Sequence, residues 1–142
     1  MRHDLESTRK FKCDNLAPMA FYETCQNLAK DLKEDDPNRK ILEYLLTNAV
    51  GRKNLKSWDK IETDLVAAGV ENLPSKENFQ TGLLGKTREC EAFIGSSPKG
   101  FFIINDREDA YVTRDFYIKR ITTQAARLDK LQKLIERQYP ID

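Results

Sequence analysis

Residues 92–104 read Ala92-Phe93-Ile94-Gly95-Ser96-Ser97-Pro98-Lys99-Gly100-Phe101-Phe102-Ile103-Ile104. Two apolar runs, 92–94 and 101–104, flank a connector that contains glycine, serine and proline. Aromatic and β-branched residues favour strands, whereas the residue types of the connector favour turns. This stretch therefore predicts a β-hairpin whose loop takes up the six residues 95–100.

Four helices are predicted before the hairpin, because apolar residues recur there at steps of three and four. Their ranges are residues 18–34, 38–50, 58–68 and 76–88. Ser57 and Ser75 stand where the third and fourth helices begin, and a serine side chain there accepts a hydrogen bond from the first turn. Gly51 and Gly69 follow the second and third helices, as glycine commonly does where a helix ends.

A long helix is predicted after the hairpin, opened by an N-cap pair, Asn105 and Glu108, and ended before Pro140. At 1.5 Å per residue it would be roughly 45–50 Å long. Its apolar stripe is formed by Tyr117, Ile121, Ala125, Leu128, Leu131 and Ile135. The stripe is either intramolecular core or the seam of a coiled coil; because the helix is too long for one small body to cover, we expect a homodimer through it.

The order of these elements indicates the fold class: mainly α with a small β-hairpin. Three short helices followed at once by a hairpin is the order of a winged helix-turn-helix, in which the third helix enters the DNA major groove and the hairpin reaches the backbone. The predicted organisation is an N-terminal lead and helix (1–36), a winged-helix domain (37–105), and a long C-terminal helix (106–142) that is a possible dimerisation element.

The segment from Cys90 to Ile103, with Asp109-Ala110 after it, resembles the wing of phage-type winged-helix proteins. Those proteins combine a Ser-Ser turn and a Lys-Gly-aromatic strand with a long following helix. The resemblance covers residues 75–142, and similar winged units form the DNA-reading part of some restriction endonucleases. It implies a DNA-binding role.

The residues predicted to contact DNA come from three segments. The polar face of the fourth helix offers side chains that pair with base edges or phosphates, and Thr87 shares that face. The wing tip and the basic segment before the third helix add small or cationic residues suited to the DNA backbone. The predicted set is Lys76, Asn78, Gln80, Thr81, Lys86 and Arg88, then Ser96, Ser97 and Lys99, then Arg52, Lys53 and Lys56.

Charge is unevenly distributed along the chain, although the formal net charge is only +1. Residues 31–36 carry four acids against Lys33, whereas residues 52–60 carry four bases against Asp59. Such a contrast can orient a protein on DNA at low total charge. The alternatives are a solvated polar face, or a protein-interaction module that uses the same fold and the long helix as a partner face.

The sequence argues against an enzyme, a metal site and a cofactor. The only histidine, His3, lies in the N-terminal lead, and no nucleophile-histidine pair or glycine-rich phosphate motif accompanies it. Cys13, Cys25 and Cys90 are odd in number and far apart, so we expect buried or half-buried thiols. No run is apolar enough for a membrane span and the start lacks a signal-peptide core, which predicts a cytoplasmic protein.

Overall fold

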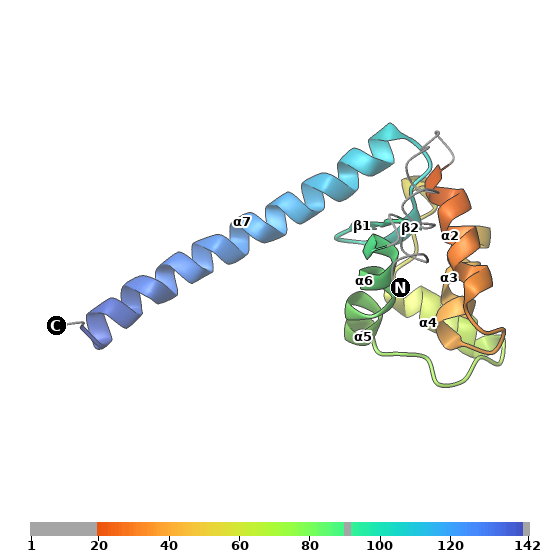
Figure 1. Cartoon of the computed structure of the whole chain (residues 1–142), viewed down its shortest axis with the longest axis horizontal. Coiled ribbons are helices and arrows are strands. Elements are labelled where there is room, and N and C mark those ends of the chain that lie inside the picture. The colour runs from red at the N-terminus through yellow and green to blue at the C-terminus, as the bar shows by residue number, and fades with distance from the viewer. Residues whose placement is uncertain (1–19, 90–91, 141–142) are drawn as a thin grey trace, which may run out of the picture.

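The helices and the hairpin lie in the predicted order in the computed structural model, which describes residues 20–89 and 92–140 (Figure 1). The elements are α2 (Ala20–Asp31), α3 (Pro37–Asn48), the 3₁₀ turn η1 (Arg52–Asn54), α4 (Trp58–Ala67), α5 (Lys76–Thr81), α6 (Leu83–Glu89), β1 (Ile94–Ser97), β2 (Gly100–Ile103) and α7 (Arg107–Gln138). The chain is therefore mainly α with one two-stranded antiparallel hairpin and a long C-terminal helix, which confirms the predicted fold class.

Side-chain caps fix where the short helices begin. The Ser57 hydroxyl accepts from the Lys60 N–H at 3.2 Å, and the Ser75 hydroxyl accepts from the Asn78 N–H at 3.1 Å, as the sequence predicted. Gly69 follows α4 with φ 87°, a left-handed conformation that glycine adopts without strain. α4 therefore has both ends, and α5 its first residue, where the capping residues predicted them.

The fourth predicted helix is two helices, and the prediction of one continuous helix over 76–88 is wrong. α5 ends at Thr81 and α6 begins at Leu83, with Gly82 between them at φ −89° and ψ −82°. A Cβ atom on Gly82 would lie 2.8 Å from the Asn78 carbonyl oxygen, so the chain turns at the one residue without that atom. Gly85, by contrast, continues inside α6.

The hairpin is tighter than predicted, with a two-residue turn at Pro98 and Lys99 in place of a six-residue loop. β1 pairs with β2 from Ile94↔Ile103 to Ser97↔Gly100. Gly95 belongs to the strand because the Phe102 ring lies over it: a Cβ there would be 2.2 Å from a ring carbon. The glycine thus admits an aromatic ring rather than forming a turn.

The segment between α3 and α4 runs beside β2 and ties the hairpin to the helices. Gly51 donates its N–H to the Ile103 carbonyl at 2.8 Å, and Lys56 and Phe101 exchange two backbone hydrogen bonds at 3.0 and 2.9 Å. Gly100 allows this close approach, since a Cβ on it would lie 2.3 Å from the Lys56 carbonyl oxygen. This arrangement of helices and hairpin is compatible with a winged helix.

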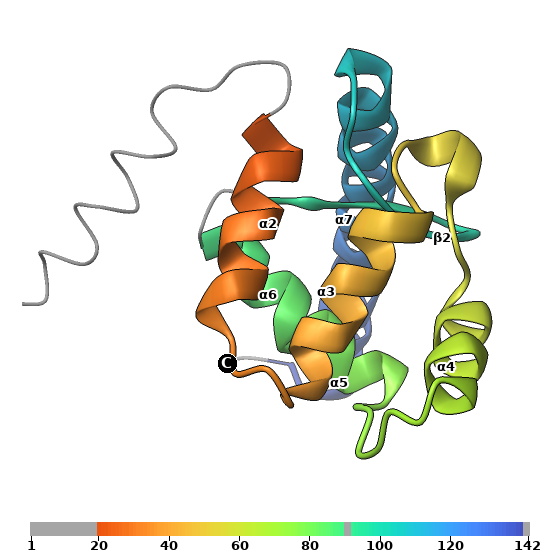
Figure 2. The ribbon, with the colours of Figure 1, turned by 90° about the vertical axis from the view of Figure 1, so that its right-hand side faces the viewer.

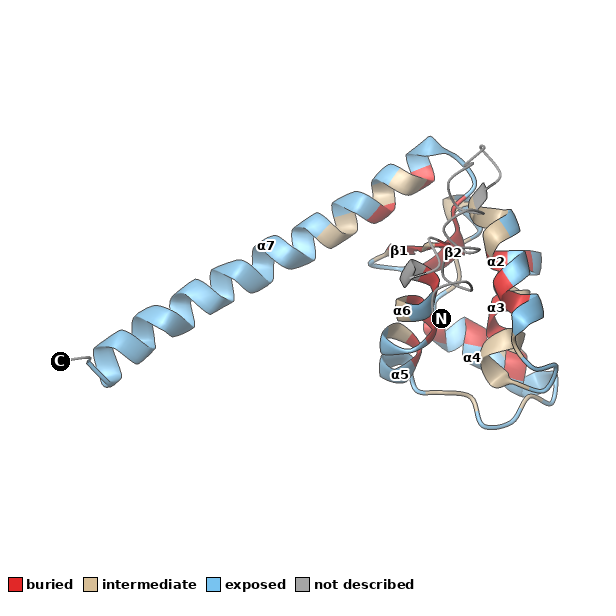
Figure 3. Ribbon diagram, in the orientation of Figure 1, coloured by how far each residue is buried: buried red, intermediate tan, exposed pale blue. Residues whose placement is uncertain are grey.

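The core lies between the helices and the inner face of the hairpin (Figures 2 and 3). Phe79 is at its centre, stacked on Trp58 at 4.9 Å between ring centroids and edge-on to Phe101 at 5.0 Å. Trp58, which is 7% exposed, is therefore part of the core. α2 adds Cys25, whose Sγ donates to the Ala92 carbonyl, and burial raises the pKa of this thiol to about 12. Cys13 and Cys90 lie outside the described residues.

α7 leaves the body as a single helix (Figures 1 and 3). Its N-cap is Asp106, which accepts from the Asp109 N–H at 2.7 Å, so the prediction of Asn105 as the cap is wrong by one residue. Only Asp109 and Thr113 of this helix are buried. Beyond Tyr117 every described residue of the helix is exposed.

Candidate nucleic-acid interface

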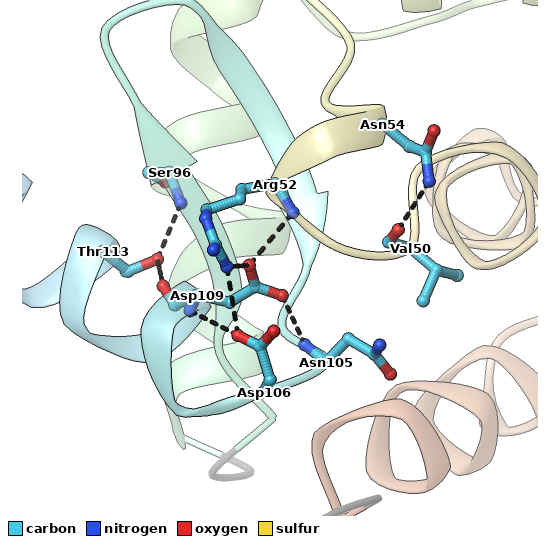
Figure 4. A network of polar contacts seen from close by, with 8 residues as sticks. All are labelled: Val50, Arg52, Asn54, Ser96, Asn105, Asp106, Asp109 and Thr113. Atoms are coloured by element: carbon cyan, nitrogen blue, oxygen red, sulfur yellow. Dashed lines mark hydrogen bonds and ion pairs between the residues drawn. The ribbon is translucent and has the colours of Figure 1, made fainter.

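A buried carboxylate, Asp109, anchors the start of α7 to the body (Figure 4). It accepts hydrogen bonds from the N–H groups of Asn105 at 2.9 Å and Arg52 at 3.1 Å, and it pairs with the Arg52 guanidinium at 2.7 Å. Burial acts to raise the pKa of this carboxyl, but these hydrogen bonds outweigh it and hold the pKa below its ordinary value. The network fixes the direction in which α7 leaves the body.

Arg52, a predicted DNA-binding residue, thus has internal partners. Its guanidinium also contacts the Asp106 carboxylate at 3.2 Å, and the carboxylates raise its pKa. Of the other two residues of this basic segment, Lys53 is exposed on η1, whereas Lys56 is half-buried beside β2. Arg52 neutralises a buried charge, which is a structural task.

The wing tip consists of Pro98 and Lys99, both exposed. Ser97 is half-buried, and its hydroxyl accepts from the Lys99 N–H at 3.2 Å. Ser96 is 2% exposed and lies in β1, where its N–H donates to the Thr113 hydroxyl at 3.2 Å. The expectation that Ser96 lies at the tip is therefore wrong, because the strands extend further than the turn-forming residues suggested.

The predicted reading face divides between α5 and α6. The structure exposes Lys76, Asn78, Thr81 and Lys86 and half-buries Gln80. Thr87 is fully buried and its hydroxyl donates to the Leu84 carbonyl at 2.7 Å, so its assignment to the polar face is wrong. Thr87 follows Leu83 by four residues, so helical spacing puts it on the same buried side of α6. The side chain of Arg88 lies outside the described residues.

α5 and the wing tip border the same hollow. Lys76 and Gln80 of α5 line it together with Pro98 and Lys99 of the wing tip. The Ser57-Trp58-Asp59 start of α4 also lines it, together with Phe101 and Phe116. The fold thus brings together cations from two of the three segments predicted to bind DNA.

The middle of α7 forms a further wall that the sequence reasoning missed. Gln80 and Thr81 of α5 face a groove that Tyr117, Arg120, Ile121 and Gln124 line from the opposite side. A second groove separates the wing tip from the cationic residues of α7. The signal in the sequence is the spacing of Lys119, Arg120 and Arg127, which puts them on one side of a helix.

Comparison of the chain with protein-family models, with curated proteins and with solved structures gave no match. Among the described residues, no helix has both the length and the apolar composition that crossing a membrane requires. The same part of the chain contains no group of three or more His, Cys, Asp or Glu placed to hold a metal ion. The functional argument therefore starts from the geometry of α5, the wing and α7.

Proposed function

We propose that the chain is a winged helix-turn-helix protein that binds duplex DNA, as a transcriptional regulator or a DNA-targeting module. The supporting observation is that Lys76 at the start of α5 and Lys99 at the wing tip, which belong to separate elements, line one hollow. Phosphates are bound by cations that converge from separate elements, and a helix beside a hairpin matches the dimensions of a major groove and its neighbouring backbone.

Base reading is assigned to α5 and phosphate contact to the wing. Asn78 and Gln80 carry amides, which pair bidentately with adenine, and Lys76 is suited to guanine or a phosphate. Lys99 is exposed on a two-residue turn held by the strands, so its ammonium reaches a backbone without a base contact. The proposal assigns no catalytic step to the chain.

α7 is proposed as a homodimerisation element. Several large apolar residues on it are exposed: Ile118, Ile121, Leu128, Leu131, Leu134 and Ile135. Four of these residues, Ile121, Leu128, Leu131 and Ile135, belong to the predicted stripe. Exposed leucine and isoleucine side chains in such a stripe are stabilised when a second helix covers them. A dimer would present two wings and two α5 helices, as two-fold proteins that bind paired DNA half-sites do.

The test is binding to random-sequence duplex DNA at several salt concentrations. The affinity should fall as salt rises, with a slope that reports the number of phosphate contacts. Lys99→Ala should lower that slope by about one, whereas Lys30→Ala, an exposed lysine on α2, should leave it unchanged. An equal effect of both substitutions would contradict the placement of the wing on DNA.

Base reading has its own test, because Asn78 is uncharged. Asn78→Ala should remove roughly 1–3 kcal/mol of discrimination between a site selected from a random library and its scrambled version. The general affinity for scrambled duplex should stay the same. A wild type without sequence preference would reduce the proposal to nonspecific binding.

The second candidate is a protein-interaction module. The observation that favours it is the apolar stripe of α7, with Ile121 and Leu128 each 65% exposed. In this alternative a helix of another protein pairs with α7 and the winged body is a scaffold. Absence of duplex binding even at low salt would favour this candidate over DNA recognition.

A further inference from the structure

A groove lies between the wing tip and the middle of α7, and all the charged residues that line it are cations. Pro98 of the wing and Phe116 of α7 form its apolar part. Lys119, Arg120 and Arg127 supply three positive charges, and the remaining lining residues are Thr123 and Gln124. The groove therefore offers cations and hydrogen-bond donors with no carboxylate to repel an anion.

These cations are not neutralised within the described part of the chain. None of the three forms an ion pair with a described carboxylate, whereas Arg52, Lys60 and Lys133 each do. The Arg120 guanidinium lies over the Phe116 ring, 5.5 Å from its centroid, which keeps it beside the groove. Unpaired cations held at a concave surface are suited to an anionic ligand.

The groove is continuous with the proposed DNA-binding surface. It shares Pro98 and Phe116 with the hollow beside α5, and it shares Arg120 and Gln124 with the groove between α5 and α7. Lys76, Lys99, Lys119, Arg120 and Arg127 line this combined surface against two acids, Asp59 and Glu77. A net charge of +3 is thus gathered there in a chain whose total is +1.

The cationic side of α7 borders its apolar stripe. At about 100° per residue, Lys119 lies roughly half a turn from Leu128. Arg120 and Arg127 lie within about 20° and about 40° of Leu131. A second helix that covers the stripe would therefore leave Lys119 open and would approach the two arginines at the edge of the stripe.

The geometry points to a phosphate-binding role for this groove: α7 is a third DNA-contacting element, which holds a backbone strand against the wing tip. This inference rests on the proposed DNA binding. From Lys119 to Arg127 the helix advances about 12 Å, which corresponds to three or four steps of a strand that rises 3.4 Å per nucleotide. Lys119 and Arg120 at one end of the groove and Arg127 at the other are thus far enough apart to contact different phosphates of one strand.

The experiment compares two double variants that remove the same charge from α7. Arg120→Ala/Arg127→Ala empties the groove of its arginines. Arg107→Ala/Arg114→Ala is the matched control, because both residues are exposed on the opposite side of the helix. Both variants should keep the helix content and the melting temperature of the wild type, and all three proteins are titrated with random-sequence duplex DNA from low to moderate salt.

The groove variant should lower the salt slope by about two, since each lost phosphate contact removes about 0.9. Its affinity near 0.1 M salt should fall on the order of tens of fold, while the control variant stays within about twofold of the wild type. Equal slopes for wild type and groove variant, or equal losses in both variants, would overturn the inference and leave the proposed function standing. A wild type that does not bind duplex at low salt would overturn both.

Discussion

The helical body and the outer part of α7 have the same apolar periodicity but opposite surroundings. In the body, Ile41 and Leu45 of α3 recur at helical spacing and are fully buried. On α7, Ile121 and Leu128 recur at similar spacing and are each 65% exposed. Periodicity therefore identifies the apolar face of a helix, but it does not reveal what covers that face.

The difference comes from length and from one anchor. The body helices α2, α3 and α4 have at most 12 residues each, so they are short enough to pack along the core. α7 has 32 residues, roughly 48 Å, and its buried residues, Asp109 and Thr113, lie near its start. Asp109 and Thr113 fix that start against η1 and β1 (Figure 4), and the rest of the helix extends away from them (Figure 1).

The largest expected effect is in the centre of the body. Phe79→Ala removes the ring that contacts both Trp58 and Phe101, and a fully buried phenylalanine leaves a cavity when truncated. We expect the free energy of unfolding to fall by about 3–5 kcal/mol in urea titrations. Leu131→Ala, the control on α7, should change it by less than about 0.5 kcal/mol at low protein concentration. Comparable losses would mean that α7 is covered.

The second-largest expected effect on stability concerns the contact between the body and the start of α7. Asp109→Asn removes a buried carboxylate and leaves Arg52, which is one third exposed, without its main partner. We expect a loss of about 2–4 kcal/mol in the free energy of unfolding at pH 7. Asp115→Asn, which breaks an exposed ion pair with Arg114 on the same helix, should cost less than about 0.5 kcal/mol.

The same variant has a predicted pH dependence. The folded state lowers the pKa of Asp109, so folding favours the ionised carboxylate. Its contribution is complete above the ordinary aspartate pKa of about 3.9 and is lost as pH falls through the lower folded value. The difference between wild type and Asp109→Asn should therefore be full at pH 7 and smaller at pH 3. A constant difference would mean that the Asp109 charge plays no part.

The third expected effect is a difference in stability between alanine substitutions at two glycines of the body. Gly95→Ala places a methyl group against the Phe102 ring, so we expect a loss of about 1–3 kcal/mol. Gly85→Ala meets no atom within 4 Å in the interior of α6, so it should stabilise the fold by about 0.5–1 kcal/mol. Thermal unfolding of both variants should show shifts of opposite sign, and a shift of the same sign would contradict the close ring contact.

The glycines of the fourth predicted helix show which parts of the fold were predictable. The helices and the hairpin followed from periodicity, and Ser57 and Ser75 were found because capping depends on neighbouring residues alone. Gly82 ends a helix and Gly85 continues one, although both stand in the same predicted helix. What distinguishes such positions is the surrounding three-dimensional packing, which local sequence does not contain.

The candidate site was predictable where it depends on the order of the elements, and not where it depends on three-dimensional packing. Lys76 and Lys99 were singled out because a winged order brings a third helix and a hairpin together, and they line one hollow. Ser96 was misplaced because the strand extends further than the turn-forming residues suggested. Thr87 was assigned to the polar face although it follows the buried Leu83 by four residues, a spacing that puts both on one side of a helix. The cationic wall of α7 was missed because its position depends on the Asp109 anchor, which joins residues 57 positions apart in the chain.

The smallest expected effect on folding belongs to the apolar stripe. Leu128→Ser/Leu131→Ser removes two exposed side chains from α7, so the midpoint of body unfolding in dilute protein should stay within about 1 °C of the wild type. The same variant should lose the dimer that we expect at tens of micromolar, because a coiled-coil seam depends on such leucines. Ala126→Ser is the control. It also introduces serine, with its lower helix propensity, but on the side of α7 opposite the stripe. Light scattering should report a dimeric mass for the wild type and the control and a monomeric mass for the double variant. A wild type that is monomeric at these concentrations would show that the exposed stripe is not a self-association surface, and the outer part of α7 would then be available to a different protein.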